Sequence, residues 1–284
     1  EDPSPQFGEI AELEGRGATR RLQEIYAAPI IPELITARLE WIRAAGVPVA
    51  GALSPGRTQD LWKTVVDAGV DLFVIRGTTV SAEHVSGSRE PLNLKRFIYE
   101  LDVPVIVGGA VTYTGALHLM RTGAAGVLAG YGGGAASATR RTVGIAAPMA
   151  TTIADIAAAR RDYLDESGGR YVHVIADGSV STTGDLVKAI ACGADAVMLG
   201  TALARAAEAP GSGWHWGQEA HHASLPRGER VRVETAGTLE EILHGPSREA
   251  AGRVNFMGAL RHAMAANGYT DIKEFQRAEL VIAD

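Results

Sequence analysis

Six short stretches rich in glycine, serine, threonine and aspartate each follow a run of apolar residues. They are Ser54-Pro55-Gly56, Gly77-Thr78-Thr79, Gly108-Gly109, Gly130–Gly134, Asp177-Gly178-Ser179 and Gly200-Thr201. In α/β barrels the carboxyl ends of the strands carry the site, so we expect the chemistry to lie in these stretches. Taken singly, each stretch could equally be a turn whose side chains cap the next helix. A small phosphorylated ligand would need only a few backbone N–H groups from them.

The apolar runs are rich in β-branched residues and lack clean alternation, which predicts strands buried on both faces of a parallel sheet. They are Val47–Leu53, Asp71–Ile75, Val103–Val107, Gly126–Ala129, Tyr171–Ala176 and Ala194–Leu199. Helix-like segments precede them, and glycine after the last helical turn is a signal for a helix end. Such glycines stand at Gly46, Gly69, Gly123 and Gly193. Spacings of roughly 25–40 residues are typical of βα units.

Six units do not close an eight-stranded barrel. Helices are predicted over Glu9–Leu13, Ala18–Tyr26 and Glu33–Ala45, so residues 1–45 offer no strand. We therefore expect an α/β fold, a TIM (β/α)8 barrel whose first two βα units lie outside the numbered residues, with an open sheet as the alternative. Because the chain begins with Glu1 rather than Met, we expect its natural start to lie upstream or to have been removed.

The composition fits a globular protein and argues against two classes of partner. The 284 residues are 46% hydrophobic, and their net charge of −6 comes without a basic stripe, which argues against nucleic acid. We find no apolar stretch of about 18 residues and no signal peptide, so we expect no membrane span. The single cysteine, Cys192, precludes an internal disulfide and indicates a reducing cytoplasm.

The order of motifs from about Val47 to Leu280 resembles the IMP dehydrogenase/GMP reductase family, most of all its bacterial IMP-dehydrogenase-related paralogues without CBS domains. The matching segments are GVDLFVIRGT, LDVPVIVGGAVT, GYGGGAASATRR, VIADGSVSTTGDLVKAIACGADAVMLGT, AEAPG and GALRHAMAANGYTDIKEF. Val174–Gly200 is the most specific of them. The resemblance implies one barrel domain over 1–284. Its parts are a helical lead-in (1–45), strands and helices (47–208), a flap (209–245) and a C-terminal segment (246–284).

The resemblance implies a site for a purine nucleoside monophosphate such as IMP, XMP or GMP. The residues that fall on nucleotide-binding positions of the family are Gly132, Gly134, Asp177, Gly178, Ser179, Gly200 and Thr201. Asp177 matches an aspartate that holds the ribose hydroxyls, because a carboxylate accepts hydrogen bonds from two vicinal hydroxyls. Its alternative role is to cap the next helix. The N–H groups of Gly200 and Thr201 would face the phosphate.

The loop that matches the family's catalytic loop departs from the pattern at its most reactive position. The family's cysteine, which attacks C2 of the purine before hydride leaves to NAD, falls on Ser137, while Thr139 keeps the pattern. A hydroxyl needs an adjacent general base, and this loop offers none. The residues on the NAD side are Arg76, which replaces an aspartate, together with Gly108 and Gly109. Ala110 and Leu128 likewise replace an asparagine and a lysine.

The predicted flap is rich in aromatic and histidine side chains. It holds Trp214, His215, Trp216, His221 and His222. Paired histidines can ligate a metal, but no cysteine or acidic residue has ligand spacing, so we expect no metal site and packing of the flap instead. Arg227 and Arg230 lie near the position of the family's Arg-Tyr pair, without a tyrosine. Tyr131 could stack on a base or belong to the core.

Three functions stay open at this point. The first is an NAD-dependent oxidoreductase that oxidises IMP to XMP in guanine nucleotide biosynthesis, which the residues at Ser137 and Arg76 oppose. The second is a catalytically inactive, regulatory protein that binds a purine nucleotide. The third is another phosphate-binding barrel, such as an FMN enzyme. The resemblance further implies NAD as the cofactor and a homotetramer as the assembly.

Overall fold

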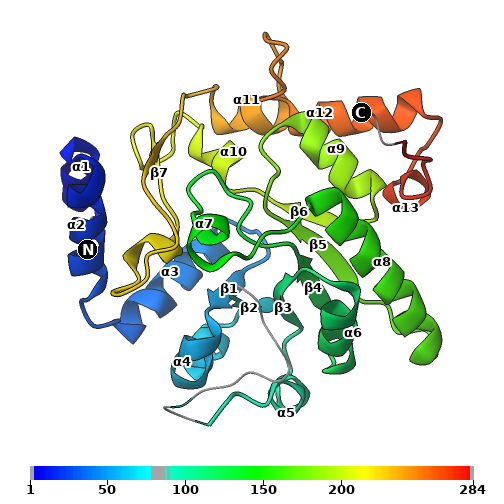
Figure 1. Cartoon of the computed structure of the whole chain (residues 1–284), viewed down its shortest axis with the longest axis horizontal. Helices are drawn as coiled ribbons and strands as arrows, with labels where there is room; N and C mark the ends of the chain where they lie inside the picture. Colours follow the sequence, from blue (N-terminus) through cyan, green and yellow to red (C-terminus); the bar gives the residue numbers. More distant parts are fainter. Residues whose placement is uncertain (1–2, 78–86, 88–89, 282–284) are drawn as a thin grey trace. The chain divides into compact units, whose positions relative to one another are not determined.

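A computed structural model of the chain describes residues 3–77, 87 and 90–281. Its residues form two compact units. Figure 1 labels the helices and strands of both. The first unit comprises Glu1–Pro29, Gly132–Ala150 and Asp177–Asp284, and the second comprises Ile30–Tyr131 and Thr151–Ala176. Thr78 and Thr79, in the second of the predicted polar stretches, lie outside the described residues.

Parallel strands that alternate with helices make up the second unit. The strands are β1 (Ala50–Leu53), β2 (Leu72–Arg76), β3 (Val105–Ala110), β4 (Gly126–Ala129) and β5 (His173–Asp177). Each pairs in parallel with the next along the chain. The helices are α3 (Pro32–Ala44), α4 (Pro55–Asp67), α5 (Leu94–Glu100), α6 (Tyr113–Arg121) and most of α8 (Met149–Glu166). Phe73, Ile75, Val107, Val127 and Val174 are fully buried, as expected for strands covered on both faces.

The first unit is mostly helical and carries Gly132–Gly134, Asp177–Ser179 and Gly200-Thr201 of the predicted polar stretches. Its helices are α1 (Ser4–Glu12), α2 (Gly15–Tyr26), α7 (Thr139–Val143), α9 (Thr183–Ala191), α10 (Thr201–Ala204), α11 (Leu239–His244), α12 (Phe256–Ala266) and α13 (Ile272–Phe275), with the short 3₁₀ helix η1 (Gln218–His221). Its strands are β6 (Ala196–Met198), β7 (Trp214–His215) and β8 (Val231–Arg232). The last two pair antiparallel.

The predicted α/β fold is confirmed. Six strands lie where the apolar runs predicted them, and residues 3–45 contain only helices and turns among the described residues. Gly69 and Gly123 follow α4 and α6 with φ of 80° and 99°, in the left-handed region that the predicted helix ends require. The first strand begins at Ala50 rather than at Val47. Pro48 has no N–H to give a neighbouring strand, and the Val49 N–H donates to the Asp71 carboxylate at 2.7 Å instead.

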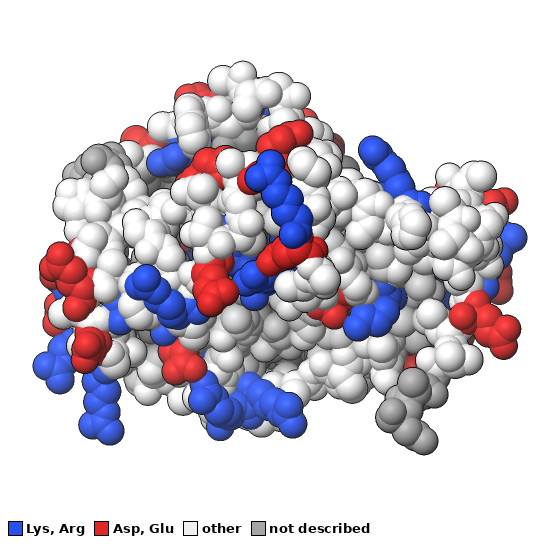
Figure 2. All heavy atoms as spheres, turned by 90° about the horizontal axis from the view of Figure 1, so that it is seen from above, with Lys and Arg blue, Asp and Glu red and all other residues white. Residues whose placement is uncertain are grey.

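The chain carries no membrane-crossing helix in the part that the structure describes, since none there is long and apolar enough. On the face drawn in Figure 2, lysine and arginine side chains are interspersed with aspartate and glutamate, with uncharged residues between them. This distribution agrees with the lack of a basic stripe in the sequence.

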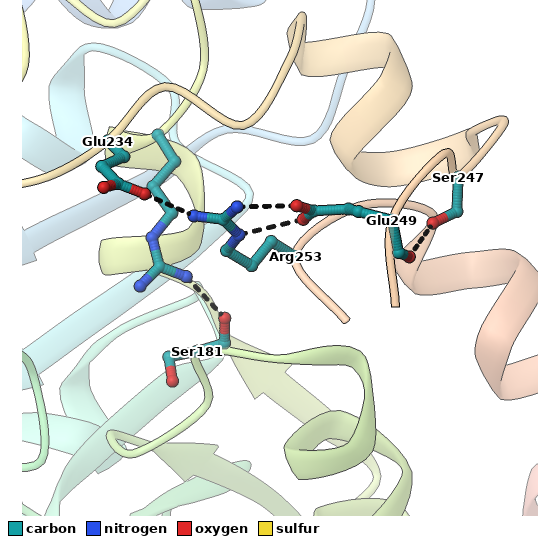
Figure 3. A network of polar contacts seen from close by, with 6 residues as sticks. Ser181, Glu234, Ser247, Glu249 and Arg253 are labelled. Carbon is teal, nitrogen blue, oxygen red and sulfur yellow. Dashed lines mark hydrogen bonds and ion pairs between the residues drawn. The ribbon is translucent and has the colours of Figure 1, made fainter. Parts of the chain in front are cut away.

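A charged network ties the C-terminal part of the first unit together (Figure 3). The Arg253 guanidinium donates to both carboxylate oxygens of Glu249, at 2.9 and 2.6 Å, and to Glu234 at 2.9 Å. The neighbouring Gly252 carbonyl accepts from the Thr183 N–H at 2.7 Å. The residue before Arg253 therefore contacts Thr183, the first residue of α9, which follows Asp177 by six positions in the sequence.

This network should make stability depend on pH in the acidic range. The hydrogen bond from Arg253 holds the pKa of Glu249 below its ordinary value of 4.5. A carboxyl with a depressed folded-state pKa contributes stability that is complete above its unfolded value and is lost as pH falls through the folded value. We expect Arg253→Met to lower the Tm at pH 7, and the gap to the parent protein to shrink below about pH 4.5. Calorimetry across pH 3–7 measures this.

Lys63→Met is the matched control, since Lys63 and Asp67 form an exposed pair one turn apart on α4. Such exposed pairs contribute little. A gap for Arg253→Met that is equally wide at pH 7 and pH 3 would contradict the account.

Candidate functional site

Three of the predicted polar loops meet in the first unit through two hydrogen bonds. The Ser179 N–H donates to the Gly133 carbonyl at 3.1 Å. The Ala135 N–H donates to the Thr201 Oγ at 3.2 Å. The loop before α7, the loop after β5 and the start of α10 are thereby joined.

The glycines of these loops divide into two kinds. A Cβ added to Gly133 would lie 2.3 Å from the Ser179 Oγ and 2.5 Å from its nitrogen, so only glycine fits there. A Cβ added to Gly134 or to Gly200 would meet nothing within 4 Å. Backbone on this side of the loops therefore borders open space, where a ligand can approach N–H groups without side chains in between.

Ser179 carries the tightest local geometry of the site. Its φ is 55°, which is uncommon for a residue with a side chain. Its N–H already donates to Gly133. What Ser179 can offer a ligand is therefore its hydroxyl rather than its backbone.

Asp177 ends β5 and is 5% exposed. The helix that follows, α9, is capped by Thr182, whose hydroxyl accepts from the Asp185 N–H while the Asp185 carboxylate accepts from the Thr182 N–H. The alternative role of Asp177 as the cap of this helix is therefore wrong. A carboxylate at the carboxyl end of a parallel strand is placed where α/β proteins bind ligands.

Ser137 and Thr139 share a carboxylate that the sequence did not reveal. The Glu219 Oε2 accepts from the Thr139 hydroxyl at 3.0 Å and from the Ser137 hydroxyl at 3.4 Å. The two hydroxyls are themselves 3.3 Å apart. Thr139 is fully buried, and Ser137 and Glu219 are half-buried. The loop of Ser137 itself offers no carboxylate, as the sequence indicated, but the fold brings the Glu219 carboxylate to Ser137 from a distant segment.

Backbone bonds bring Glu219 to this position. The Glu219 carbonyl accepts from the Arg227 N–H at 3.0 Å. Residues 227–229 then run antiparallel to residues 136–138 in a bridge that pairs Gly228 with Ser137. In that bridge the Glu229 N–H donates to the Ala136 carbonyl at 2.8 Å. Glu219 and Ser137 are 82 residues apart, so no spacing within a motif could have paired them.

The residues predicted to contact NAD, Arg76, Gly108 and Gly109, lie in the second unit. The two glycines stand where neighbouring backbone leaves no room for a side chain. A Cβ on Gly108 would lie 2.3 Å from the Leu128 Cβ, and one on Gly109 would lie 2.3 Å from the Gly130 carbonyl oxygen. Arg76 ends β2, in register with Gly108. Leu128 and Tyr131 are buried, at 1% and 3% exposure, so Tyr131 belongs to the core. These glycines are thus explained by packing, whether or not a cofactor binds.

Packing also accounts for the aromatic residues of the predicted flap. Trp216 contacts the Phe7 ring edge-on at 5.7 Å, and His221 stacks on Tyr26 at 4.4 Å. No three His, Cys, Asp or Glu side chains come together as a possible metal site among the described residues. Cys192 directly follows α9 and is half-buried, and burial raises the pKa of its thiol.

A hollow of about 680 Å³ opens in the second unit and has cationic walls. Its lining residues include Lys95, Arg96, Arg121 and Arg170. Arg96 pairs with Glu100 at 2.7 Å, and Arg121 pairs with Glu166 at 2.6 Å. The hydrogen bond from Arg121 lowers the pKa of Glu166. Because two of its cations already face carboxylates, this hollow is a weaker candidate for an anion than the glycine loops of the first unit.

Comparison with known proteins agrees with the motifs. Residues 43–221 match the model of the IMP dehydrogenase / GMP reductase domain. The chain is 54% identical to an uncharacterized oxidoreductase of Mycolicibacterium smegmatis, over 99% of this chain and 76% of that protein. It is 31% identical to inosine-5'-monophosphate dehydrogenase of Aquifex aeolicus, over 80% of this chain and 48% of that protein.

A solved structure gives the same result for the fold. The crystal structure of an IMP dehydrogenase/GMP reductase-like protein from Corynebacterium glutamicum superposes with a TM-score of 0.92 at 50% identity. The superposition covers 99% of this chain and 75% of that one.

Proposed function

The chain belongs to the IMP dehydrogenase/GMP reductase family, and from that premise we propose that it binds a purine nucleoside 5'-monophosphate in the first unit. The phosphate would lie against backbone N–H groups of the loops that contain Gly134 and Gly200, with the Ser179 hydroxyl beside them. The ribose hydroxyls would donate to Asp177. IMP, XMP and GMP share the 5'-phosphate and the ribose hydroxyls, so we propose the class of purine nucleoside monophosphates rather than one of them.

One observation carries this proposal: three loops joined by hydrogen bonds, two of which present glycine backbone to open space. Backbone N–H groups bind phosphate well because they need no desolvation of a charged side chain. Asp177 supplies the second requirement, an anionic acceptor that is not used to cap a helix. Its role follows from chemistry, since a carboxylate accepts hydrogen bonds from paired hydroxyls.

A second candidate function is NAD-dependent oxidation of IMP to XMP, the reaction suggested by the name of the Aquifex aeolicus relative. The cluster of Ser137, Thr139 and Glu219 is the observation in its favour, because hydroxyls beside a carboxylate can hold and polarise a water molecule. The serine at the nucleophile position weighs against it. We place nucleotide binding first and redox activity second, with NAD as the cofactor that the second would use.

The proposed assembly is a homotetramer, and the proposed location is the cytoplasm, in keeping with a single cysteine. Light scattering of the purified protein tests the assembly. A mass equal to one chain would rule it out.

Removing the Asp177 carboxylate should weaken nucleotide binding. We expect Asp177→Ala to cost about 1.5–3 kcal/mol, the range for hydrogen bonds to a charged group, which corresponds to roughly a 10- to 150-fold rise in Kd. Calorimetric titration with IMP, XMP and GMP measures this effect. The exposed Asp155→Ala on α8 is the matched control and should bind as the parent does. Equal Kd values for Asp177→Ala and the parent would remove Asp177 from the site.

A further inference from the structure

The geometry points to a positioning role for the α1–α2 pair: through Arg230 and Ala220, it holds the segment 217–230 so that the Glu219 carboxylate stays at Ser137 and Thr139. This inference deepens the proposed function, and it rests on that proposal only for the use to which the positioned carboxylate is put. The contacts themselves all lie within the first unit.

Arg230 joins the segment to the end of α1. Its guanidinium donates to the carbonyls of Ile10 and Ala11, the latter at 2.9 Å. The last four carbonyls of a helix have no partner within the helix, and the helix dipole places negative charge there. No Lys, Arg or His stands in the last turn of α1, so the cation that caps this end comes from a residue 220 positions away. The guanidinium also lies 3.5 Å from the centre of the Trp214 ring.

Ala220 joins the segment to the faces of both helices. Ile10, Leu22 and Ala220 form one buried cluster, at 2%, 1% and 1% exposure, and Ile25 and Trp216 pack against it. The Gln23 side chain donates to the His222 carbonyl at 2.8 Å. Ala220 follows Glu219 directly in sequence, so a fixed Ala220 leaves the Glu219 backbone little room to move.

Gly228 connects Ala220 to the loop that contains Ala136 and Ser137. A Cβ at Gly228 would lie 3.1 Å from the Ala220 nitrogen and 3.2 Å from the Ala136 carbonyl oxygen. The strand of residues 227–229 is therefore packed between the residue beside Glu219 and the residue beside Ser137. A shift of the α1–α2 pair would be passed across this contact to the Glu219 side chain.

The segment needs such support because it has little structure of its own. Its one helical element is η1, with four residues, and the strands β7 and β8 that flank it are two residues each. A two-stranded pair and a single helical turn are unstable in water without packing partners. The order of the segment, and with it the position of Glu219, therefore comes from the helices that cover it.

Amide hydrogen exchange tests the inference on the full chain without nucleotide. We expect Arg230→Met, which keeps the apolar stem and removes the guanidinium, to speed exchange of residues 217–223 at least 10-fold. Peptides from β2 to β4 in the second unit should exchange as in the parent. Arg230→Lys should restore part of the protection, because an ammonium can still donate to one of the two carbonyls. Arg232→Met, two residues further along in β8, is the matched control, with its guanidinium 5.2 Å from the Trp214 ring.

Unchanged exchange of residues 217–223 in Arg230→Met would overturn the inference, and so would an equal rise in both units. If Arg230→Met does not fold, Leu22→Ala replaces it as the test, because Leu22 packs against Ala220 from α2. The same faster exchange of residues 217–223 is expected. Unchanged exchange there, or an equal rise in both units, would again overturn the inference. These outcomes do not depend on nucleotide, so they stand apart from failure of the proposed function. A parallel titration with IMP then reports whether loosening Glu219 changes the Kd of the nucleotide.

Discussion

Gly134→Asp is expected to weaken IMP binding at least 100-fold while the protein stays folded. The backbone of Gly134 is outside the left-handed region, and an added Cβ meets nothing within 4 Å, so the fold should accept the side chain. A carboxylate placed there would face the phosphate. Two unit charges about 4 Å apart repel by about 4 kcal/mol at an effective dielectric constant near 20. A 100-fold loss requires only about 2.7 kcal/mol.

Calorimetric titration gives the Kd, and thermal unfolding shows that the variant is folded. Gly134→Ala separates charge from bulk and should lose less affinity. Gly56→Asp on α4 controls for the added acid, since Gly56 also faces open space and lies in the second unit. IMP binding by Gly134→Asp at the parent's Kd would mean that the phosphate lies elsewhere.

The second expected result is that the protein forms little or no NADH from IMP and NAD. The sequence predicts Ser137 at the nucleophile position, and a carboxylate such as Glu219 is far too weak a base to ionise an alcohol. Loss of the nucleophile typically costs several orders of magnitude in rate. Turnover near 1 per second, within the ordinary enzyme range, would contradict this.

Ser137→Cys alone should rescue little. The introduced thiol would lie beside the Glu219 carboxylate, and a like charge raises the pKa of a thiol and disfavours the thiolate. By the sequence prediction, Arg76 also stands where the family has an aspartate on the nicotinamide side. We therefore expect Ser137→Cys/Glu219→Gln to react with iodoacetamide faster than Ser137→Cys, with Ser137→Ala as the unreactive control. Equal rates in the two cysteine variants would show that Glu219 does not act on this position.

Local patterns were enough to predict the elements of this fold. Buried parallel strands carry apolar β-branched runs whatever their neighbours are, so Gly126–Ala129 was predicted to the residue. Where a single side chain intervenes, the prediction shifts: Val49 bonds to Asp71, and the strand starts later. Ser137, Thr139 and Asp177 could be found because each lies in a motif that is continuous in sequence.

Contacts between distant segments could not be predicted in this way. Glu219 lies in a stretch without a recognisable motif, and contacts between distant segments, among them the Gly228 bridge, bring it to Ser137. Helices α1 and α2 were predicted, but their apolar faces do not reveal which segment covers them. Gly108 and Gly109 stay a prediction for the cofactor side, and close packing against Leu128 and Gly130 is a second reason for glycine at these positions, which the sequence alone did not reveal.

A crystal structure of the protein with IMP tests the central claim most directly. The account predicts the phosphate within hydrogen-bond distance of backbone N–H groups in the loops that contain Gly134 and Gly200, and ribose hydroxyls within that distance of the Asp177 carboxylate. Nucleotide bound instead in the hollow lined by Lys95, Arg96 and Arg121, or no nucleotide at saturating IMP, would contradict it.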